Sequence, residues 1–311
     1  MTTSDQIDYY IHHQPDITTI DFNNDHVGYL PRNIGLLTNL QILNLDHNQL
    51  MKLPNEIGNL TNLQELHLNY NRLLELPSTI GNLVNLRKLY LNRNRLDTLP
   101  NTIGNLVSLT DIHLASNEIN ILPSTIGNLT SLINLYIDNN LLKSLPDSIG
   151  NLVNIDHIDL KKNRLIELPD SIGNLISLKK LAVSFNVLTR LPDSIGKLIN
   201  VVEINVMSNH LTHLPESIGN LTQVTKLYLT DNRLRSLPRS IGTMTSLLEI
   251  QMTINQITEL PDTMDQLAQL IRLEFDSSII SSVSDFREVV RWNYLNKTIN
   301  LIEVWVNYYR N

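Results

Sequence analysis

The stretch LPDSIGNLVNIDHIDLKKNRLIE, residues 145–167, decides the fold, because the same pattern fills most of the chain. Its first dipeptide, Leu-Pro, recurs at residues 30, 53, 76, 99, 122, 145, 168, 191, 214, 237 and 260, always 23 residues apart. A fixed period of this length is the signature of a solenoid, in which each unit buries its apolar face by stacking on its neighbours. A length of 311 residues alone would suggest two domains, but the repeat predicts one elongated domain.

The apolar spacing within each unit is that of a leucine-rich repeat. In one unit Leu63, Leu66, Leu68 and Leu73 follow the pattern L-x-x-L-x-L-x-x-N-x-L, which places a short strand on one side of each coil. Side chains alternate along a strand, so Leu66 points inward and its two neighbours point outward. The predicted fold class is an α/β solenoid, a leucine-rich-repeat horseshoe with a parallel β-sheet on the concave face and short helical turns on the convex face.

Three further positions of the unit are nearly invariant. An Asn follows each strand at a tight bend, where its amide is expected to satisfy buried backbone groups of adjacent coils. Pro54 and its equivalents suit a connecting segment or the start of a helical turn, because proline lacks a donor and fixes φ. Gly58 and its equivalents allow either a close approach or a positive φ. The Asn residues are Asn48, Asn71, Asn94, Asn117, Asn140, Asn163, Asn186, Asn209, Asn232 and Asn255.

The repeat pattern predicts three segments. Residues 17–283 form the leucine-rich-repeat solenoid, which begins with a half coil at Ile17 and continues as eleven 23-residue units. Residues 1–16 form an N-terminal cap or arm. Residues 284–311 are expected to form a C-terminal cap that begins with a helix capped by Ser284, the alternative being an independent binding tail.

Charge and composition limit the classes of partner and the cellular location that we expect. Lys and Arg total 24 against 31 Asp and Glu, a net charge of -7, which argues against generic binding to nucleic acid or to anionic lipid. The chain has no cysteine, no secretion signal and no long apolar run. We therefore expect a cytoplasmic protein that binds neither nucleic acid nor a membrane and exists as a monomer.

The full pattern L-P-x-x-I-G-N-L-x-x-L-x-x-L-x-L-x-x-N-x-L resembles the 23-residue intracellular leucine-rich repeats of the Ras-group scaffolds, the Scribble-type polarity proteins and the plant intracellular Ras-group proteins. The resemblance covers residues 17–283. It implies a role in signalling through protein binding on the concave face, with a small GTPase among the expected partners.

One column of outward strand positions carries four consecutive amphipathic rings, on His67, Tyr90, His113 and Tyr136. Large rings with a polar tip are favoured at interface hot spots, so these residues are the candidate protein-binding site. Tyr70 and Arg93 lie on neighbouring columns and enlarge it. The alternative is that the rings stack on one another and only stiffen the sheet.

Two sets of charges are weaker candidates. The column next to the rings, which includes Glu65, Lys88 and Asp111, alternates in sign and is interpreted as a ladder of pairs between strands. A secondary basic patch would dock an acidic segment, although solvated charge explains it equally simply. The patch consists of Lys161, Lys162, Arg164, Lys179 and Lys180.

The sequence contains no catalytic motif: no P-loop, G-x-G-x-x-G, H-E-x-x-H or G-x-S-x-G occurs. We predict no catalytic residue, no cofactor and no metal, and no enzymatic activity. The expected function is a protein–protein interaction scaffold or adaptor that binds its partner on the concave face. The alternative is a substrate-recognition subunit that recruits clients to an enzyme through its terminal segments.

Overall fold

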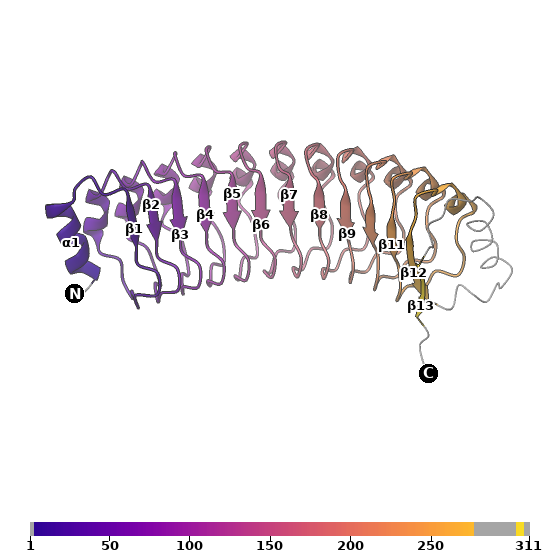
Figure 1. Cartoon of the computed structure of the whole chain (residues 1–311), viewed down its shortest axis with the longest axis horizontal. Helices are drawn as coiled ribbons and strands as arrows, with labels where there is room; N and C mark the ends of the chain where they lie inside the picture. The colour runs from indigo at the N-terminus through magenta and orange to yellow at the C-terminus, as the bar shows by residue number, and fades with distance from the viewer. Residues whose placement is uncertain (1–2, 277–302, 308–311) are drawn as a thin grey trace. The chain divides into compact units, whose positions relative to one another are not determined.

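The computed structural model describes residues 3–276 and 303–307, which fall into two compact units divided between Arg164 and Leu165. Both units repeat a coil of one short strand, in most coils three residues long, and one short 3-10 helix (Figure 1). The elements of the first unit are α1 (Thr3–His13), β1 (Thr19–Asp21), η1 (Arg32–Leu36), β2 (Ile42–Asn44), η2 (Asn55–Asn59), β3 (Glu65–His67), η3 (Ser78–Asn82), β4 (Lys88–Tyr90), η4 (Asn101–Asn105), β5 (Asp111–His113), η5 (Ser124–Asn128), β6 (Asn134–Tyr136), η6 (Asp147–Asn151) and β7 (His157–Asp159). The elements of the second unit are η7 (Asp170–Asn174), β8 (Lys180–Ala182), η8 (Asp193–Lys197), β9 (Glu203–Asn205), η9 (Glu216–Asn220), β10 (Lys226–Tyr228), η10 (Arg239–Thr243), β11 (Glu249–Gln251), η11 (Asp262–Gln266), β12 (Arg272–Asp276) and β13 (Glu303–Asn307).

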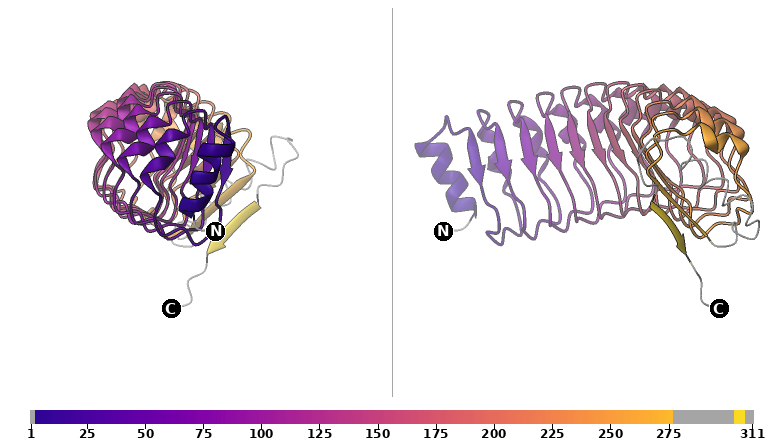
Figure 2. Two further views of the ribbon diagram at one scale, coloured as in Figure 1. Left: turned by 90° about the vertical axis from the view of Figure 1, so that its left-hand side faces the viewer. Right: turned by 45° about the vertical axis from the view of Figure 1, so that its right-hand side comes forward.

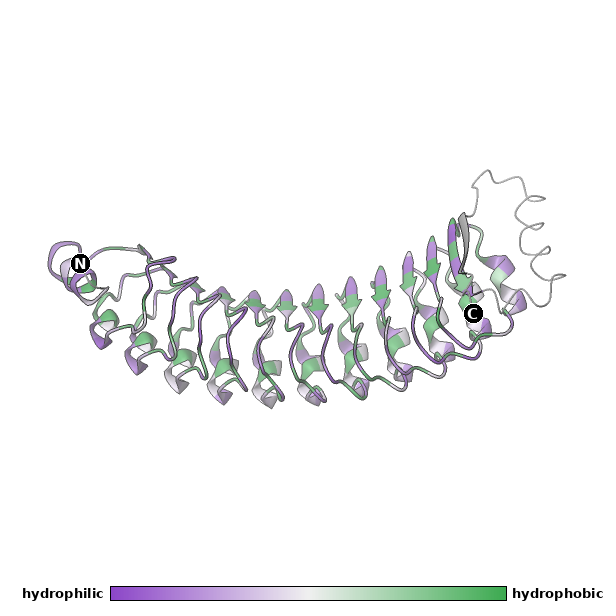
Figure 3. Cartoon of the chain, turned by 90° about the horizontal axis from the view of Figure 1, so that it is seen from below, coloured by the Kyte–Doolittle hydropathy of each residue, from purple (hydrophilic) through white to green (hydrophobic). Residues whose placement is uncertain are grey.

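Successive strands pair in parallel within each unit, and from β1 to β12 the paired residues of one unit are 23 positions apart. Glu65 of β3 lies opposite Lys88 of β4, 23 positions later, and Lys180 of β8 lies opposite Glu203 of β9 in the same way. The strands lie on one side of each coil and the 3-10 turns on the other (Figure 3). The predicted fold class, a leucine-rich-repeat solenoid with a parallel sheet on one face and short helical turns on the other, is confirmed.

The core of each coil is a ring of aliphatic side chains. In the coil that contains β3, Ile57 and Leu60 of the helical turn and Leu63, Leu66 and Leu68 of the strand side are completely buried. Burying such a side chain contributes roughly 1.5 to 3 kcal/mol. Because the same set of buried aliphatic side chains recurs from coil to coil, hydrophobic stabilisation is distributed along each unit.

Proline and glycine shape the helical turns. Pro54 precedes η2 with φ of -70°, so proline acts at the start of a helical turn, as predicted. All positive φ values of the described chain belong to residues other than glycine, which decides between the two roles predicted for Gly58. A Cβ at Gly58 would lie 2.5 Å from the carbonyl oxygen of Thr79 in the next coil. Glycine is therefore required for close packing of adjacent turns.

The predicted asparagine ladder is present. Asn71 donates from Nδ2 to the carbonyl oxygens of Leu45, at 2.8 Å, and Leu68, at 3.2 Å. Its Oδ1 accepts the backbone N–H of Leu50 at 3.0 Å. A buried polar backbone group without a partner is costly, and here a single side chain satisfies three of them. The ladder thus fixes both the bend after each strand and the spacing to the preceding coil.

The N-terminal helix α1 and the residues that follow it contact the first coil. Ile7 of α1 is completely buried, the carboxylate of Asp8 accepts a hydrogen bond from Asn33, and that of Asp16 accepts one from Asn39 at 3.0 Å. Figure 2 shows α1 lying across that end of the first unit.

At the C-terminal end, β13 extends the sheet of the second unit by pairing in parallel with β12. The helix predicted after Ser284 lies outside the described residues, as does most of the segment 284–311. Among the residues that the structure describes, no helix is long and apolar enough to cross a membrane.

Candidate protein-binding surface

The predicted ring column lies on the exposed face of the sheet of the first unit, which we call the sheet face. His67, Tyr90, His113 and Tyr136 end the adjacent strands β3, β4, β5 and β6 and lie directly opposite one another in the strand register. The middle residue of each of these strands, such as Leu89 of β4 and Ile112 of β5, points the other way and is completely buried. The structure therefore brings together the four rings that the sequence predicted.

The four rings form one continuous stack. The ring centroids of His67 and Tyr90 are 4.5 Å apart, those of Tyr90 and His113 are 4.7 Å apart, and those of His113 and Tyr136 are 4.6 Å apart. Stacked or tilted pairs at this spacing contribute about 0.5 to 1.5 kcal/mol each beyond the area that they bury. The stacking named as the alternative role therefore exists, and it leaves each ring half-buried with its outer part facing solvent.

A fifth ring, which was not predicted from the sequence, extends the stack. The ring of His157 on β7 lies with its centroid 5.1 Å from that of Tyr136. His157 belongs to the neighbouring charged column, so a search down a single column does not find it. Diagonal neighbours on adjacent strands are within reach of aromatic side chains, and a search along diagonals would have found it. We call His67, Tyr90, His113, Tyr136 and His157 the ring stack.

Burial shifts the pKa values of two members of the ring stack, and hydrogen bonds shift that of the neighbouring Glu65. Burial tends to raise the pKa of Glu65, but hydrogen bonds from Lys88 and His67 outweigh it and hold that pKa below its usual value. Burial lowers the pKa of His113 and raises that of Tyr90. Near neutral pH, His113 therefore presents a neutral imidazole and Tyr90 an intact phenol, which can donate and accept hydrogen bonds.

Tyr70 and Arg93 lie at the bend that follows the strands, next to the ring stack. Both have left-handed backbone conformations, with φ of 54° and 55°. The guanidinium carbon of Arg93 lies 5.1 Å from the centroid of the Tyr70 ring. On its other side Tyr70 stacks on His47, with centroids 4.2 Å apart. His47 was not among the residues predicted from the sequence. The same repeat position one unit earlier was the available signal.

The charged column beside the rings forms the predicted pairs between strands. Lys88 pairs with Glu65 at 3.0 Å in the first unit. Lys180 pairs with Glu203 at 2.9 Å and Arg272 with Glu249 at 3.3 Å in the second unit. These pairs join neighbouring strands, as a register-keeping ladder requires. All are partly exposed, where an ion pair contributes at most about 1 kcal/mol.

The secondary basic patch is divided between the units. Lys161, Lys162 and Arg164 belong to the first unit, and Lys179 and Lys180 to the second. Lys161 pairs with the buried Asp159 at 3.0 Å, while Lys180 pairs with Glu203. Two of the five cations therefore already have a carboxylate partner within their own unit, which favours the interpretation of this patch as ordinary surface charge.

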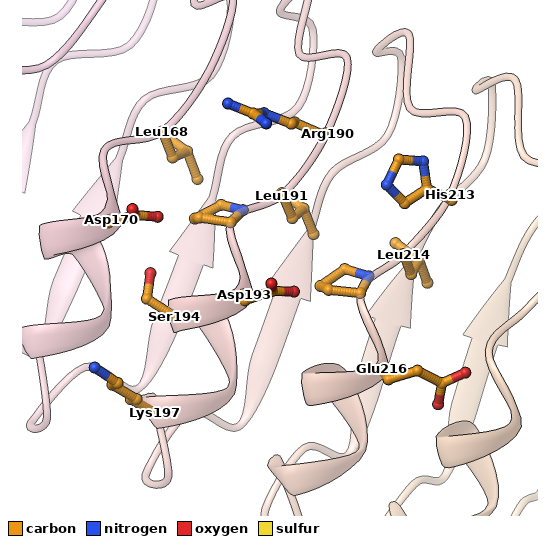
Figure 4. Close-up of a pocket in the computed structure, with 12 residues that line it drawn as sticks. Leu168, Asp170, Arg190, Leu191, Asp193, Ser194, Lys197, His213, Leu214 and Glu216 are labelled. Carbon is orange, nitrogen blue, oxygen red and sulfur yellow. The ribbon is translucent and has the colours of Figure 1, made fainter.

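The second unit has an open groove beside its helical turns (Figure 4). Basic side chains of Arg190 and Lys197 and acidic side chains of Asp170, Asp193 and Glu216 line it. The three acids occupy the same position of successive units, directly after the proline. The groove therefore arises from the spacing of the coils, and its mixed charges do not converge on one kind of ligand. No cluster of three metal-ligating side chains occurs among residues 3–276 and 303–307.

Comparisons with known proteins agree with the geometry. A leucine-rich repeat region model matches residues 77–161, and models of the leucine-rich repeat match residues 39–60, 62–83 and 176–234. A leucine-rich-repeat protein of Leptospira interrogans is 30% identical, with a TM-score of 0.62 over 96% of this chain and 86% of that chain. The chain belongs to the leucine-rich-repeat proteins. No curated protein matches it significantly.

Two further solved structures are similar and contain partners. The leucine-rich-repeat ectodomain of the membrane receptor kinase GASSHO1/SCHENGEN3 from Arabidopsis thaliana, in complex with CASPARIAN STRIP INTEGRITY FACTOR 2, is 30% identical, with a TM-score of 0.63. The match covers 80% of this chain and 34% of that chain. The leucine-rich-repeat chain FLRT2, in an octameric complex with Latrophilin 3 and Unc5D, has a TM-score of 0.72 over 94% of this chain and 90% of that chain. At 24% identity it shows a shared fold alone.

Proposed function

We propose that this chain is a protein–protein interaction scaffold or adaptor that binds a folded partner on the sheet face of its first unit. The ring stack is the observation that carries the proposal. Five half-exposed rings on adjacent strands offer amphipathic surface of the kind that interface hot spots use. The complex of the similar plant ectodomain supports a binding role for this fold.

The proposal includes a location and a class of partner. The 23-residue pattern resembles intracellular Ras-group and Scribble-like repeats, so we propose a cytoplasmic, signalling protein that binds a small GTPase as a monomer and without enzymatic activity of its own. Fractionation of the source cells tests the location, because the similar plant protein is an ectodomain. The recruiting role predicted as the alternative rests on the terminal segments. Of residues 284–311 only β13 is described, so that role stays a prediction.

The decisive experiment replaces Tyr90, His113 and Tyr136 together with alanine. A partner is first captured from the source organism and identified by mass spectrometry, and its affinity for the purified chain is then measured by calorimetry. Truncating a hot-spot side chain costs about 2 kcal/mol or more. Three such losses should weaken binding at least 100-fold even with imperfect additivity.

A matched control keeps the test specific. Tyr228 occupies the same strand position on β10 of the second unit, and Tyr228→Ala should change the affinity less than threefold. The triple variant loses its stacking contacts, so a lower melting temperature is expected, but its buried leucines keep it folded. Normal binding by a folded triple variant would refute the assignment of the site.

A further inference from the structure

A second surface lies at one edge of the sheet face, where the bends after β2, β3 and β4 follow one another. His47, Tyr70 and Arg93 occupy equivalent positions of these bends, all in the left-handed region, with φ of 56°, 54° and 55°. Tyr70 is clamped between the His47 ring, at 4.2 Å, and the Arg93 guanidinium, at 5.1 Å. Imidazole, phenol and guanidinium thus form a three-layer stack, which we call the edge ridge.

The backbone does not explain these three residues. A left-handed conformation favours Gly or Asn and disfavours bulky side chains. The next two coils place Ser116 and Asn139 at the same position, with φ of 59° and 55°. Later coils place Lys162, Phe185 and Ile254 there, with φ of 53°, 57° and 58°. The fold therefore accepts both small and large residues at this position, so the backbone does not select the particular side chains of the edge ridge. Tyr70 remains 44% exposed despite its two stacking partners, so it is available to a ligand.

Two further arginines beside Arg93 give the edge ridge a positive surrounding, and from here on we include them in the edge ridge. Arg72 and Arg95 follow Tyr70 and Arg93 by two residues in the same bends, and like Arg93 they are exposed. Among the residues that the structure describes, none of these three arginines forms an ion pair, although other cations of the first unit, such as Lys88 and Lys161, do. In a chain with a net charge of -7, three unpaired guanidinium groups on two adjacent coils form a local exception.

We propose that the edge ridge binds an acidic, carboxylate-rich segment of the protein partner. Guanidinium groups match carboxylates in bidentate geometry, and pairs of this kind are stronger and more directional than those of lysine. Adjacent coils lie about 4.8 Å apart, so arginines on two of them reach neighbouring side chains of one short segment. The contact with the Tyr70 ring holds the Arg93 guanidinium in place before binding. This reduces the side-chain entropy that Arg93 loses on binding. The inference rests on the proposed function in one respect, namely that the segment belongs to a protein partner.

A protein segment fits better than nucleic acid. Binding to a phosphate backbone relies on many lysines and arginines spread along the polyanion. Here the positive charge is confined to two coils, and the acidic chain as a whole repels a long polyanion. A short acidic segment needs only the local charge.

The test uses fluorescence anisotropy with the full chain and a labelled decaglutamate peptide at low salt. Decaglutamine serves as the uncharged probe, and a single-stranded DNA oligonucleotide serves as a second polyanion. We expect decaglutamate to bind, with an affinity that falls as salt is raised, and decaglutamine not to bind. The variant Arg72→Ala/Arg93→Ala/Arg95→Ala should weaken decaglutamate binding at least tenfold. It should lower the melting temperature by no more than roughly 4 °C, because all three side chains are exposed and only the contact of Arg93 with Tyr70 is lost.

The matched control is Arg233→Ala/Arg235→Ala in the second unit. Arg233 follows its ladder asparagine as Arg95 does, but the residue at the left-handed position of that bend is Asp231. This control should bind decaglutamate within twofold of the unmodified chain. A second variant, Arg93→Lys, keeps the charge but loses the planar group over Tyr70, and should weaken binding by a smaller factor than the triple variant.

Each other result overturns the proposal. No binding of decaglutamate, an equal loss in the triple variant and the control, or tighter binding of the DNA with the same dependence on the three arginines would each refute it. The readout is independent of the proposed function, because the ring variant Tyr90→Ala/His113→Ala/Tyr136→Ala leaves the edge ridge intact and should still bind decaglutamate. Failure of the peptide assay therefore refutes the edge ridge, whereas failure of the partner assay refutes the ring stack.

Discussion

Replacing Asn94 with alanine should destabilise the first unit far more than replacing Asn85, although both asparagines belong to the same coil. Asn94 is buried, and its Oδ1 accepts the backbone N–H of Leu73 at 3.0 Å. Its Nδ2 donates to the carbonyl oxygens of Leu68, at 2.8 Å, and Leu91, at 3.1 Å. Alanine leaves all three backbone groups without this partner.

The magnitude follows from these three bonds. The Leu73 N–H is left unsatisfied, at about 1 to 3 kcal/mol, whereas the carbonyl oxygens of Leu68 and Leu91 each lose one bond but still accept from Asn71 and Asn117, at about 0.5 to 1.5 kcal/mol each. Asn94→Ala should therefore cost about 3 kcal/mol in all. Asn85 makes one exposed hydrogen bond, from Nδ2 to the carbonyl oxygen of Thr61 at 2.8 Å, and its loss should cost about 0.5 to 1 kcal/mol. For a unit of this size the melting temperature should fall by roughly 6 to 12 °C in the first variant and roughly 1 to 4 °C in the second.

A third variant separates hydrogen bonding from volume. Asn94→Asp preserves the shape of the side chain but replaces the Nδ2 donor with an oxygen that faces two carbonyl oxygens. It should destabilise at least as much as Asn94→Ala, and the melting temperatures of all variants are measured by circular dichroism at pH 7. Equal melting temperatures for the Asn94 and Asn85 alanine variants would refute the role given to the ladder.

Three other expectations use different features of the fold. Gly58→Ala should cost about 1 to 3 kcal/mol by overpacking, because the new Cβ would lie 2.5 Å from the Thr79 carbonyl oxygen, whereas Gly28→Ala, with no atom within 4 Å of its Cβ, should leave the melting temperature within 1 °C or so of the unmodified value. Ile254→Asn should raise stability by about 1 kcal/mol, because Ile254 is a β-branched residue held at φ of 58°, and an unchanged or lower melting temperature would show that its side chain contributes packing. Burial lowers the pKa of His113 below its ordinary value of 6.5, so at lower pH the unfolded chain binds a proton that the folded chain does not, and stability falls as pH falls from about 7 through the folded pKa. His113→Phe should reduce that fall in thermal melts between pH 5 and pH 8, and an identical pH dependence in both proteins would show that His113 does not cause it.

The fold was predictable from the sequence because stacking constrains the same positions in every unit. The leucines, the ladder asparagines and the prolines recur 23 residues apart, and each recurrence indicates the same coil. The role of Gly58 was left open because close approach and positive φ both select glycine. Only the positions of the atoms of Thr79 in the next coil decide it.

A second ladder of hydrogen bonds could not be predicted, because its members vary. The side chains of Asp46, Asn69 and Asn92 each accept the backbone N–H of the residue 23 positions later, at 2.6, 2.8 and 2.8 Å, and the chain of bonds ends at Ala115. A column that ends after three members does not stand out from ordinary surface variation. Its geometry depends on the bend after the strand, and the sequence pattern does not specify that bend in atomic detail.

The candidate site was only partly predictable for a related reason. The strand register gave the column from His67 to Tyr136, because side chains of parallel strands align when the repeat has no insertion. His157 was missed because it reaches Tyr136 across columns, whereas His47 lies in the same column as Tyr70 and was missed because the strand columns, and not the bends, were followed back to earlier units. Contacts along diagonals depend on rotamers, and the spacing of residues in the sequence does not determine them.

The observed stacking also changes the relation between the two roles considered for the rings. An isolated exposed tyrosine or histidine loses rotamer freedom when a partner binds, at a cost of about 0.5 to 1.5 kcal/mol for each side chain. In the ring stack each inner ring is already held between two others, 4.5 to 5.1 Å away, so much of that cost is met when the protein folds. Stiffening the sheet and binding a partner are therefore not competing explanations, because the contacts that rigidify the rings also prepare them for binding. The same reasoning applies to Arg93, whose guanidinium lies over the Tyr70 ring, and it explains why both surfaces lie in the unit where rings occur on consecutive coils.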